Sequence, residues 1–290
     1  MGLQALELGE AFEQIRRFLS YLPASVWETP PRLDAEDDPG RREEALLSFI
    51  PRDRRKVYDT RKRLALVLDR GSFFEMGRYF GRPLVTGFAR LDGIPVGVMA
   101  NDPRFAAGAI NADAGEKMQR FVDLCDTFHL PVVNFVDNPG FLVGTEAERR
   151  GTIRKGVRAL SAVFQATVPW CSVIVRKAYG VAGAGHSNHT RSSPRWAWPS
   201  GEWGSLPIEG GVEAAYKRVI AASDDPDATR RELEAKLESL RDPILTAEAF
   251  GVEELIDPRD TRPLLVEWAH RAYEIVASER GGPKGRGMRP

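Results

Sequence analysis

The sequence predicts an α/β fold in which a β-hairpin is followed by alternating helices and strands. Two apolar segments, 84–91 and 95–102, flank Asp92-Gly93, which is the strongest short-range signal for a hairpin turn. The segment 131–138 has the Val and Phe content and the short length of a buried strand, and 172–179 is a further strand candidate. A helical pattern precedes each of them. A chain of 290 residues can form one large domain or two small ones.

Two segments precede this core. Apolar residues recur at helical spacing through 6–22, which predicts one amphipathic helix. Residues 23–44 are rich in Pro and acidic side chains, which is typical of an extended linker, either wrapped on something or exposed. A helix is then expected over 58–69. We divide the chain into an N-terminal helix and linker (1–56), one folded domain (57–280) and a flexible tail (281–290).

Periodicity and turn signals place the remaining elements. Residues 113–128 form an amphipathic pattern, and a Gly/Pro loop separates the strand at 131–138 from a helix at 147–166. The strand at 172–179 leads into a Gly-rich turn that opens a short helix. A short strand is expected around Trp196–Trp198, and the rest is almost all helix, at 211–222, 227–241, 245–251 and 261–279, with a break at Asp257-Pro258.

Charge and composition exclude several classes of protein. The 41 Lys and Arg residues balance 41 Asp and Glu residues, so a generally basic nucleic-acid binder is excluded. Cys125 and Cys171 both lie in apolar segments, which excludes a disulfide framework and a cysteine-rich metal site. The N-terminus lacks a signal-peptide pattern, and no run approaches the roughly 18–20 apolar residues of a membrane span. We expect a cytoplasmic protein with no nucleic-acid or membrane partner.

The Gly-rich turn from Gly180 to Gly185 is a candidate for chemistry. Small residues let the backbone approach a ligand, and unpaired N–H groups at a helix N-terminus can hold a developing oxyanion. The turn lacks the Gly-Lys-Ser/Thr ending of a P-loop and does not match GxGxxG. The alternative is that its small residues serve only tight packing of strand against helix.

The loop from Asp137 to Thr145 is a second candidate. It leaves a predicted buried strand at its carboxyl end, where open α/β folds form their crevices. Phe141 and Leu142 would be apolar walls of such a crevice. The alternative is that Pro139-Gly140 is simply a turn. Asp137 is an isolated acid in the sequence, as is Glu202, and neither can be assigned a role in acid/base catalysis.

Other patterns are weaker. The segment from Arg52 to Arg70 has eight basic residues against three Asp, which suits phosphates or an acidic partner, or else a solvated helix face. His186 and His189 have the spacing of a metal pair, but no carboxylate or cysteine lies in the same turn, so we expect no metal site. The GxSxG signature of a serine nucleophile is absent from the sequence.

Four long segments occur in a recognisable order: GSFFEMGRYFGRPLVTGFARLDGIPVGVMAND (71–102), FVDLCDTFHLPVVNFVDNPGFLVGTEAERRGTIRKG (121–156), ATVPWCSVIVRKAYGVAGAG (166–185) and WAWPSGEWG (196–204). In this order they resemble the carboxyltransferase β-subunits of biotin-dependent acyl-CoA carboxylases of the propionyl-CoA and acetyl-CoA type. The flanking residues agree, since 11–56 resembles that family's inter-domain linker and 211–290 its C-terminal helices and basic tail.

The resemblance implies a crotonase-like spiral of ββα units, in keeping with the hairpin-and-helix order. Members of the family carry two such domains, the first mainly holding acyl-CoA and the second mainly holding carboxybiotin. This chain resembles only the second, so the active site would be completed by a separate N-terminal-domain subunit. The implied partners are that subunit, a biotin carboxyl carrier protein and a biotin carboxylase, in a hetero-oligomer that acts on an acyl-CoA.

The implied reaction transfers a carboxyl group from N-carboxybiotin to the α-carbon of the acyl-CoA. The acyl-CoA enolate and the ureido oxygen of biotin both carry developing negative charge, so backbone N–H donors are expected for each. Carried over by position, the second-domain donors fall on Val181 and Ala182, directly after Gly180. The stretch that lines the biotin side matches Phe141, Gly144, Thr145 and a helix start that includes Gly151, Ile153, Lys155 and Gly156.

The turn departs from the family pattern Tyr-Gly-Gly-Ala-Tyr-Asp, since residues 179–184 read Tyr-Gly-Val-Ala-Gly-Ala. Val181 places a β-branched side chain, which disfavours positive φ, where Gly lets a ligand approach. Either the donor geometry is kept at negative φ or the site has changed. Gly183 and Ala184 replace a bulky ring and a carboxylate that shape the acyl pocket, so we expect a larger, less polar pocket for a longer or branched acyl chain.

Two other functions stay open. One is a decarboxylase of malonyl-type thioesters on the same fold, acting without biotin. The other is a catalytically silent assembly or regulatory subunit, for which Val181 is the motivating feature.

Overall fold

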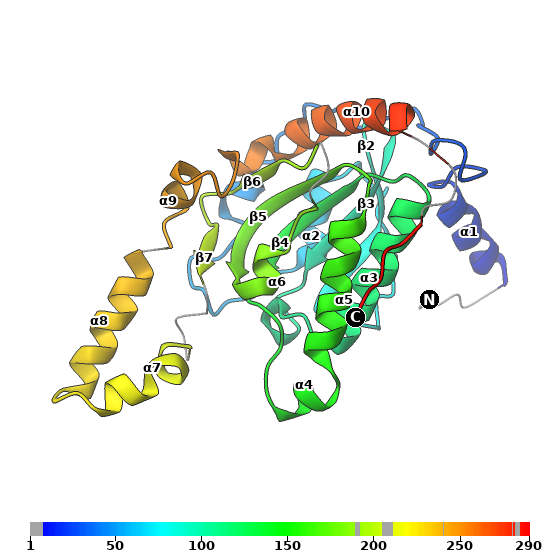
Figure 1. Ribbon diagram of the computed structural model, residues 1–290. Helices are drawn as coiled ribbons and strands as arrows, with labels where there is room; N and C mark the ends of the chain where they lie inside the picture. The colour runs from blue at the N-terminus through cyan, green and yellow to red at the C-terminus, as the bar shows by residue number, and fades with distance from the viewer. Residues whose placement is uncertain (1–7, 189–191, 205–210, 240, 280, 282–284) are drawn as a thin grey trace.

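The computed structural model describes residues 8–188, 192–204, 211–239, 241–279, 281 and 285–290. In this part of the chain eight strands form one mixed sheet at the centre of the molecule (Figure 1). The first three pair antiparallel and the later ones parallel, in the order β1-β2-β3-β4-β5-β6-β8, with β7 beside β5. The strands are β1 (Phe74–Met76), β2 (Leu84–Leu91), β3 (Ile94–Asn101), β4 (Val132–Asn138), β5 (Trp170–Tyr179), β6 (Arg195–Ala197), β7 (Glu202–Gly204) and β8 (Glu254–Leu255).

The predicted hairpin is confirmed. Leu91 of β2 lies opposite Ile94 of β3, so Asp92 and Gly93 form a two-residue turn. Their φ angles are 53° and 73°, positive at both positions as a type I′ turn requires. This turn matches the twist of the two strands and so sets the register of the hairpin.

Helices cover both faces of the sheet, which confirms the predicted α/β class. On one face α3 and α5 pack over a core that contains Met99 and Trp170. On the other face α2 and α10 pack over a core that contains Val98 and Phe135. Because both faces are covered, β2, β3 and β4 are buried along their whole length. The helices are α1 (Leu8–Leu19), α2 (Thr60–Val67), α3 (Ala112–Thr127), α4 (Thr145–Arg149), α5 (Thr152–Gln165), α6 (Gly180–Ala184), α7 (Gly211–Ala221), α8 (Pro226–Ser239), α9 (Pro243–Glu248) and α10 (Thr261–Glu279), with 3-10 turns η1 (Glu44–Ser48), η2 (Ala106–Gly108) and η3 (Pro258–Asp260).

Some elements differ from the prediction. The prediction of a single helix at 147–166 is wrong, because two helices occur there. α4 ends at Arg149, and Gly151, with a left-handed φ of 66°, precedes the start of α5. A chain in that conformation cannot continue the first helix. β1, β7 and β8 are additional strands of only two or three residues, too short for an alternating pattern to be recognised.

The linker wraps on the folded body. Arg41 donates to the carbonyls of Leu66 and Leu68, and Arg262 of α10 donates to the carbonyl of Asp38. Leu46 of η1 is buried in the core beneath α10. Of the two possibilities for this segment, the structure therefore shows the wrapped one.

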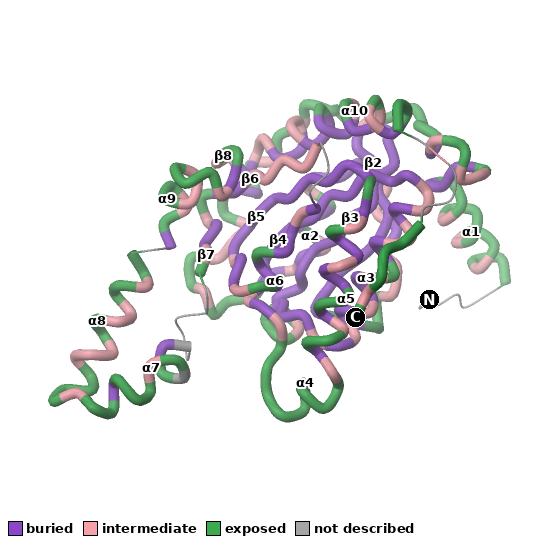
Figure 2. The backbone as a smooth tube through the Cα atoms, viewed as in Figure 1, coloured by how far each residue is buried: buried purple, intermediate pink, exposed green. Residues whose placement is uncertain are grey.

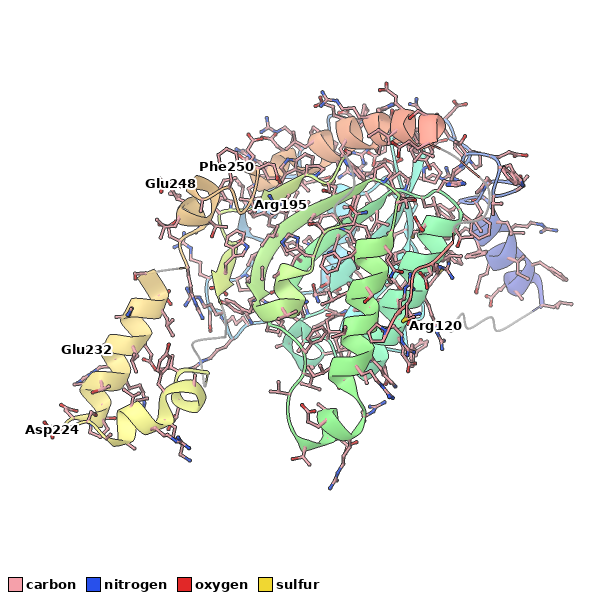
Figure 3. The ribbon with its side chains drawn as sticks, in the orientation of Figure 1. Arg120, Arg195, Asp224, Glu232, Glu248 and Phe250 are labelled. Carbon is pink, nitrogen blue, oxygen red and sulfur yellow. The ribbon has the colours of Figure 1, made fainter. Side chains whose placement is uncertain are left out.

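Two C-terminal features lie at the edge of the body. α7 and α8 form a helical hairpin that projects away from the sheet (Figure 1), and Figure 3 shows Asp224 and Glu232 on it, far from the sheet. At the other side, Arg286 donates to Thr127 of α3 and Arg289 donates to Gln165 of α5, so the described residues of the C-terminal tail contact both helices. No helix in the described ranges is both long enough and apolar enough to span a bilayer.

Candidate functional site

The loops that follow β3, β4 and β5 meet at the carboxyl edge of the sheet. Asn101, the last residue of β3, accepts from the N–H of Asp137 in β4 at 3.2 Å and donates to the carbonyl of Gly108 at 3.0 Å. Asn138 at the end of β4 donates from Nδ2 to the carbonyl of Ala182 in α6 at 3.1 Å. Crevices of open α/β folds form at this edge, so both loops singled out in the sequence lie at a site of the expected kind.

Gly180 sets the direction of α6, which follows β5 directly. Its φ is 59°, a left-handed conformation that Gly adopts freely. Val181 lies inside α6 and is not among the described residues with positive φ. Its β-branched side chain therefore causes no backbone strain at this position.

The first turn of α6 presents backbone donors. Val181 and Ala182 belong to the first turn, where N–H groups have no acceptor within the helix. The Val181 side chain is 67% exposed, whereas Ala182 is buried. The start of α6 is therefore exposed to solvent at Val181 and covered at Ala182.

The other two glycines of the turn serve packing. A Cβ on Gly183 would come closer than 3.0 Å to the backbone of Ala178, and one on Gly185 would meet the Leu160 side chain of α5 at less than that distance. Tight packing, one of the two interpretations of the Gly-rich turn, therefore accounts for Gly183 and Gly185. Gly183 and Gly185 allow close packing of α6, whereas Gly180 and Val181 form its open start. The volume that a ring at 183 would need is filled by backbone, while Ala184 is exposed.

The predicted biotin-side residues fall into two groups. Gly144 and Thr145 line a cavity of about 310 Å³ together with Asn111 at the start of α3. Phe141, expected to be an apolar wall of the crevice, packs its ring against Gly156 of α5 so closely that a Cβ on Gly156 would overlap the ring. Phe141 therefore positions the loop, and the cavity lies beyond it.

The helix residues of the same stretch differ in exposure. Ile153 is 45% exposed on the first turn of α5. Lys155 pairs with Glu116 of α3 at 2.6 Å, and that contact lowers the pKa of the Glu116 carboxyl. Gly151, the residue before α5, has open space where a Cβ would be.

Asp137 is the buried anchor of this edge, which the sequence did not indicate. Its carboxylate accepts from Arg176 at 2.8 Å and from the Tyr58 hydroxyl at 2.8 Å, and all three residues are buried. Burial and the nearby Asp137 charge raise the pKa of Tyr58 above its usual value. These residues hold β4, β5 and the segment before α2 together, so Asp137 is a positioning residue. A pairing across 79 positions of sequence leaves no local signal.

A second charged cluster joins α8 to the body. Glu202 of β7 pairs with Arg54 at 3.1 Å and with Arg241 at 3.5 Å, beside a cavity of about 720 Å³. The Arg241 guanidinium lies 5.1 Å from the ring centroid of Tyr179, the residue before α6. The cluster links the helical hairpin to the end of β5.

Three of the eight basic residues in the segment from Arg52 to Arg70, namely Arg54, Arg61 and Arg63, are held in ion pairs or buried within the protein. Arg54 pairs with Glu202 and Glu238, while Arg61 pairs with Asp102 at 2.6 Å and with Glu75. Arg63 is buried against the Tyr58 and Phe135 rings.

No metal cluster of His, Cys, Asp or Glu occurs among the described residues. His186 is buried, and burial lowers the pKa of its imidazole to about 4. His189 lies outside the described residues. Cys125 and Cys171 are both buried and free.

Comparisons with known proteins agree on one family. The pattern of the carboxyl transferase domain matches residues 3–277. The chain is 43% identical over 259 residues to the propionyl-CoA carboxylase carboxyltransferase subunit of Haloferax mediterranei, covering 89% of this chain and 50% of that one. It is 35% identical to the methylmalonyl-CoA decarboxylase subunit alpha of Veillonella parvula, covering 97% and 54%.

A solved structure of similar fold gives the same result. Transcarboxylase 12S, a hexamer determined with methylmalonyl-CoA and methylmalonic acid bound, superimposes with a TM-score of 0.84 at 34% identity, covering 97% of this chain and 54% of that one. The chain spans about half the length of the curated relatives it matches.

Proposed function

This chain belongs to the carboxyl transferase domain family, and from that premise we propose that it is the C-terminal-domain subunit of a split acyl-CoA carboxyltransferase. The match to about half of each relative supports an active site completed by a separate N-terminal-domain subunit. The further partners we propose are a biotin carboxyl carrier protein and a biotin carboxylase, in a hetero-oligomer. We keep residues 57–280 as the carboxyltransferase domain, with the helix and linker before it and the basic tail after it.

The open first turn of α6 is the observation that carries the proposal. Its N–H groups on Val181 and Ala182 stand at the carboxyl edge of the sheet, with Gly180 taking the positive φ. Such donors suit an oxygen that gains negative charge during the reaction. Carboxybiotin, when bound, supplies the carboxyl group that is transferred to the acyl-CoA. The donor set at α6 fits its ureido oxygen.

The chain's own residues keep these donors in place. Asn138 holds the Ala182 carbonyl, and close packing at Gly183 and Gly185 seats α6 on β5 and α5. The pair of Asp137 and Arg176 secures the two strands below. Donors that need no rearrangement stabilise charge more effectively than mobile ones.

We propose a longer or branched acyl group as the substrate. The side chains that the family uses at 183 and 184 are absent, and the exposed Ala184 leaves room at that end of α6. Since backbone fills the space beside Gly183, the preference rests on Ala184. The acyl pocket therefore gains less volume than the replacement of both family side chains, at 183 and 184, would suggest.

Reconstitution tests the proposal. The chain is combined with the first-domain subunit, the biotin carrier protein and the biotin carboxylase of the same organism, and ATP-dependent fixation of bicarbonate is measured over a series of straight and branched acyl-CoAs. We expect fixation that requires this chain. A complex that fixes no bicarbonate on any acyl-CoA would overturn the proposal, and highest activity on acetyl-CoA would overturn the acyl preference.

Decarboxylation of a malonyl-type thioester is the second candidate. It is favoured by the 35% identity over 97% of the chain to a methylmalonyl-CoA decarboxylase subunit. Release of CO2 from a malonyl-type thioester by the same complex, without net carboxylation, would select it. The silent-subunit alternative was motivated by an expected conflict between Val181 and a positive φ. That support is lost, because Val181 lies in α6 without positive φ.

A further inference from the structure

α1 is an amphipathic helix that the described part of the chain covers only along one edge. None of its 12 residues is buried, and Figure 2 draws it in the colours of exposed and intermediate residues at the edge of the molecule. Its C-terminal end is attached to the body: the Phe18 ring lies 5.7 Å from that of Phe88, and Arg17 donates to the carbonyl of Gly71 at 2.6 Å.

Four large apolar side chains form one stripe along α1. Leu8, Phe12, Ile15 and Leu19 are 74%, 50%, 51% and 55% exposed. At about 100° per residue they fall within roughly 60° of one another, about a quarter turn from Phe18, which faces the body. These four residues are called the α1 stripe. The α1 stripe and Phe18 form one continuous apolar surface on α1, and the body covers only its Phe18 edge.

A helix in this state needs a partner. Isolated helices of about 12 residues are marginal in water, and most helices in proteins are held by packing of an apolar face. Contiguous exposed apolar side chains on one face mark interaction sites. The polar side of α1 carries Glu10 and Glu13 against Arg16 and Arg17, so it lacks the net positive charge that would draw it to an anionic membrane surface.

We propose that the α1 stripe binds the other carboxyltransferase domain. An apolar groove about 18 Å long on that domain receives α1 as a helix. The chain matches about half of its relatives and corresponds to their C-terminal half, so in those proteins the other domain lies just before the α1 segment. Chain connectivity there places that domain beside α1. The inference rests on the proposed function, because it takes the first-domain subunit as the occupant.

Binding of stripe variants tests the inference. The full chain is titrated with the first-domain carboxyltransferase subunit of the same organism, and Kd is measured by calorimetry. Phe12→Ala/Ile15→Ala keeps good helix formers in α1, and we expect its Kd to rise at least about tenfold; Phe12→Glu/Ile15→Glu should raise it further. Glu13→Gln/Arg16→Gln, on the polar side of the same helix, is the matched control and should change Kd by less than about twofold.

The outcomes separate the two levels of the proposal. Loss of affinity in the stripe variants alone supports docking at α1. Equal affinity of wild type and stripe variants overturns the docking site but leaves the split carboxyltransferase standing. No binding by the wild-type chain overturns both. If the stripe variants instead abolish self-association of this chain and leave partner binding unchanged, a second copy occupies the stripe and the inference is wrong.

Discussion

Val181→Pro removes one backbone donor from α6. Proline is tolerated in the first turn of a helix, where the lost N–H has no intrahelical acceptor, and Val181 has no positive φ to oppose the ring. Because proline also restricts the preceding residue, Gly180, the change tests the donor only where Tm shows that the fold is kept.

The expected loss is that of one oxyanion donor. Removing such a donor costs about 2.7–4 kcal/mol of transition-state stabilisation, or roughly 10²–10³ in kcat. The reconstituted complex is assayed for carboxylation under saturating acyl-CoA, with Tm as a check on folding. Val181→Ala keeps the N–H and is the matched control, expected within about twofold of wild type.

Two results would refute the reasoning. If folded Val181→Pro keeps wild-type kcat, the Val181 N–H does not stabilise the transition state. If Val181→Ala loses as much activity as Val181→Pro, the side chain rather than the donor is what matters.

Three further predictions concern stability. Gly156→Ala places a Cβ against the Phe141 ring, so the free energy of unfolding in urea should fall by about 1–3 kcal/mol. Asp137→Asn leaves buried Arg176 without its carboxylate and should cost about 3–5 kcal/mol in the same assay. Burial lowers the pKa of His186 to about 4 in the folded state. The unfolded chain therefore takes up a proton there first as pH falls below 6.5, and stability should fall between pH 6.5 and 4 by about 3 kcal/mol.

Controls make these predictions decisive. Gly9→Ala, where a Cβ meets no atom within 4 Å, should not destabilise the chain, so an equal loss at Gly9 and Gly156 would contradict the packing argument. An Asp137→Asn variant as stable as wild type would contradict the prediction, because it would show that other groups compensate the buried Arg176 charge. His186→Gln should flatten the acid limb of the pH profile, and superimposable profiles would exclude His186 as its source.

Local chemistry in the sequence determined much of the fold and the family. Asp92-Gly93 specifies a two-residue turn by itself, because both positions accept positive φ, and the strands on either side follow from it. Helical periodicity is also a local signal, since the pattern repeats within a few turns, and it located α3 and α10. The four long segments carried the family resemblance, which the match over residues 3–277 confirms. Gly151 shows the limit of such reasoning, as one left-handed residue divided a predicted helix.

Tertiary structure decided which residues come together. Only the order of the parallel strands brings Asn138 to the carbonyl of Ala182, and Asp137 to Arg176 and Tyr58, because these contacts join segments 39 to 79 positions apart. Only packing distinguishes Gly183, which has no room for a side chain, from Gly180, which takes a positive φ. Periodicity in sequence shows that a helix has an apolar face, but whether that face is covered depends on what the rest of the chain places against it.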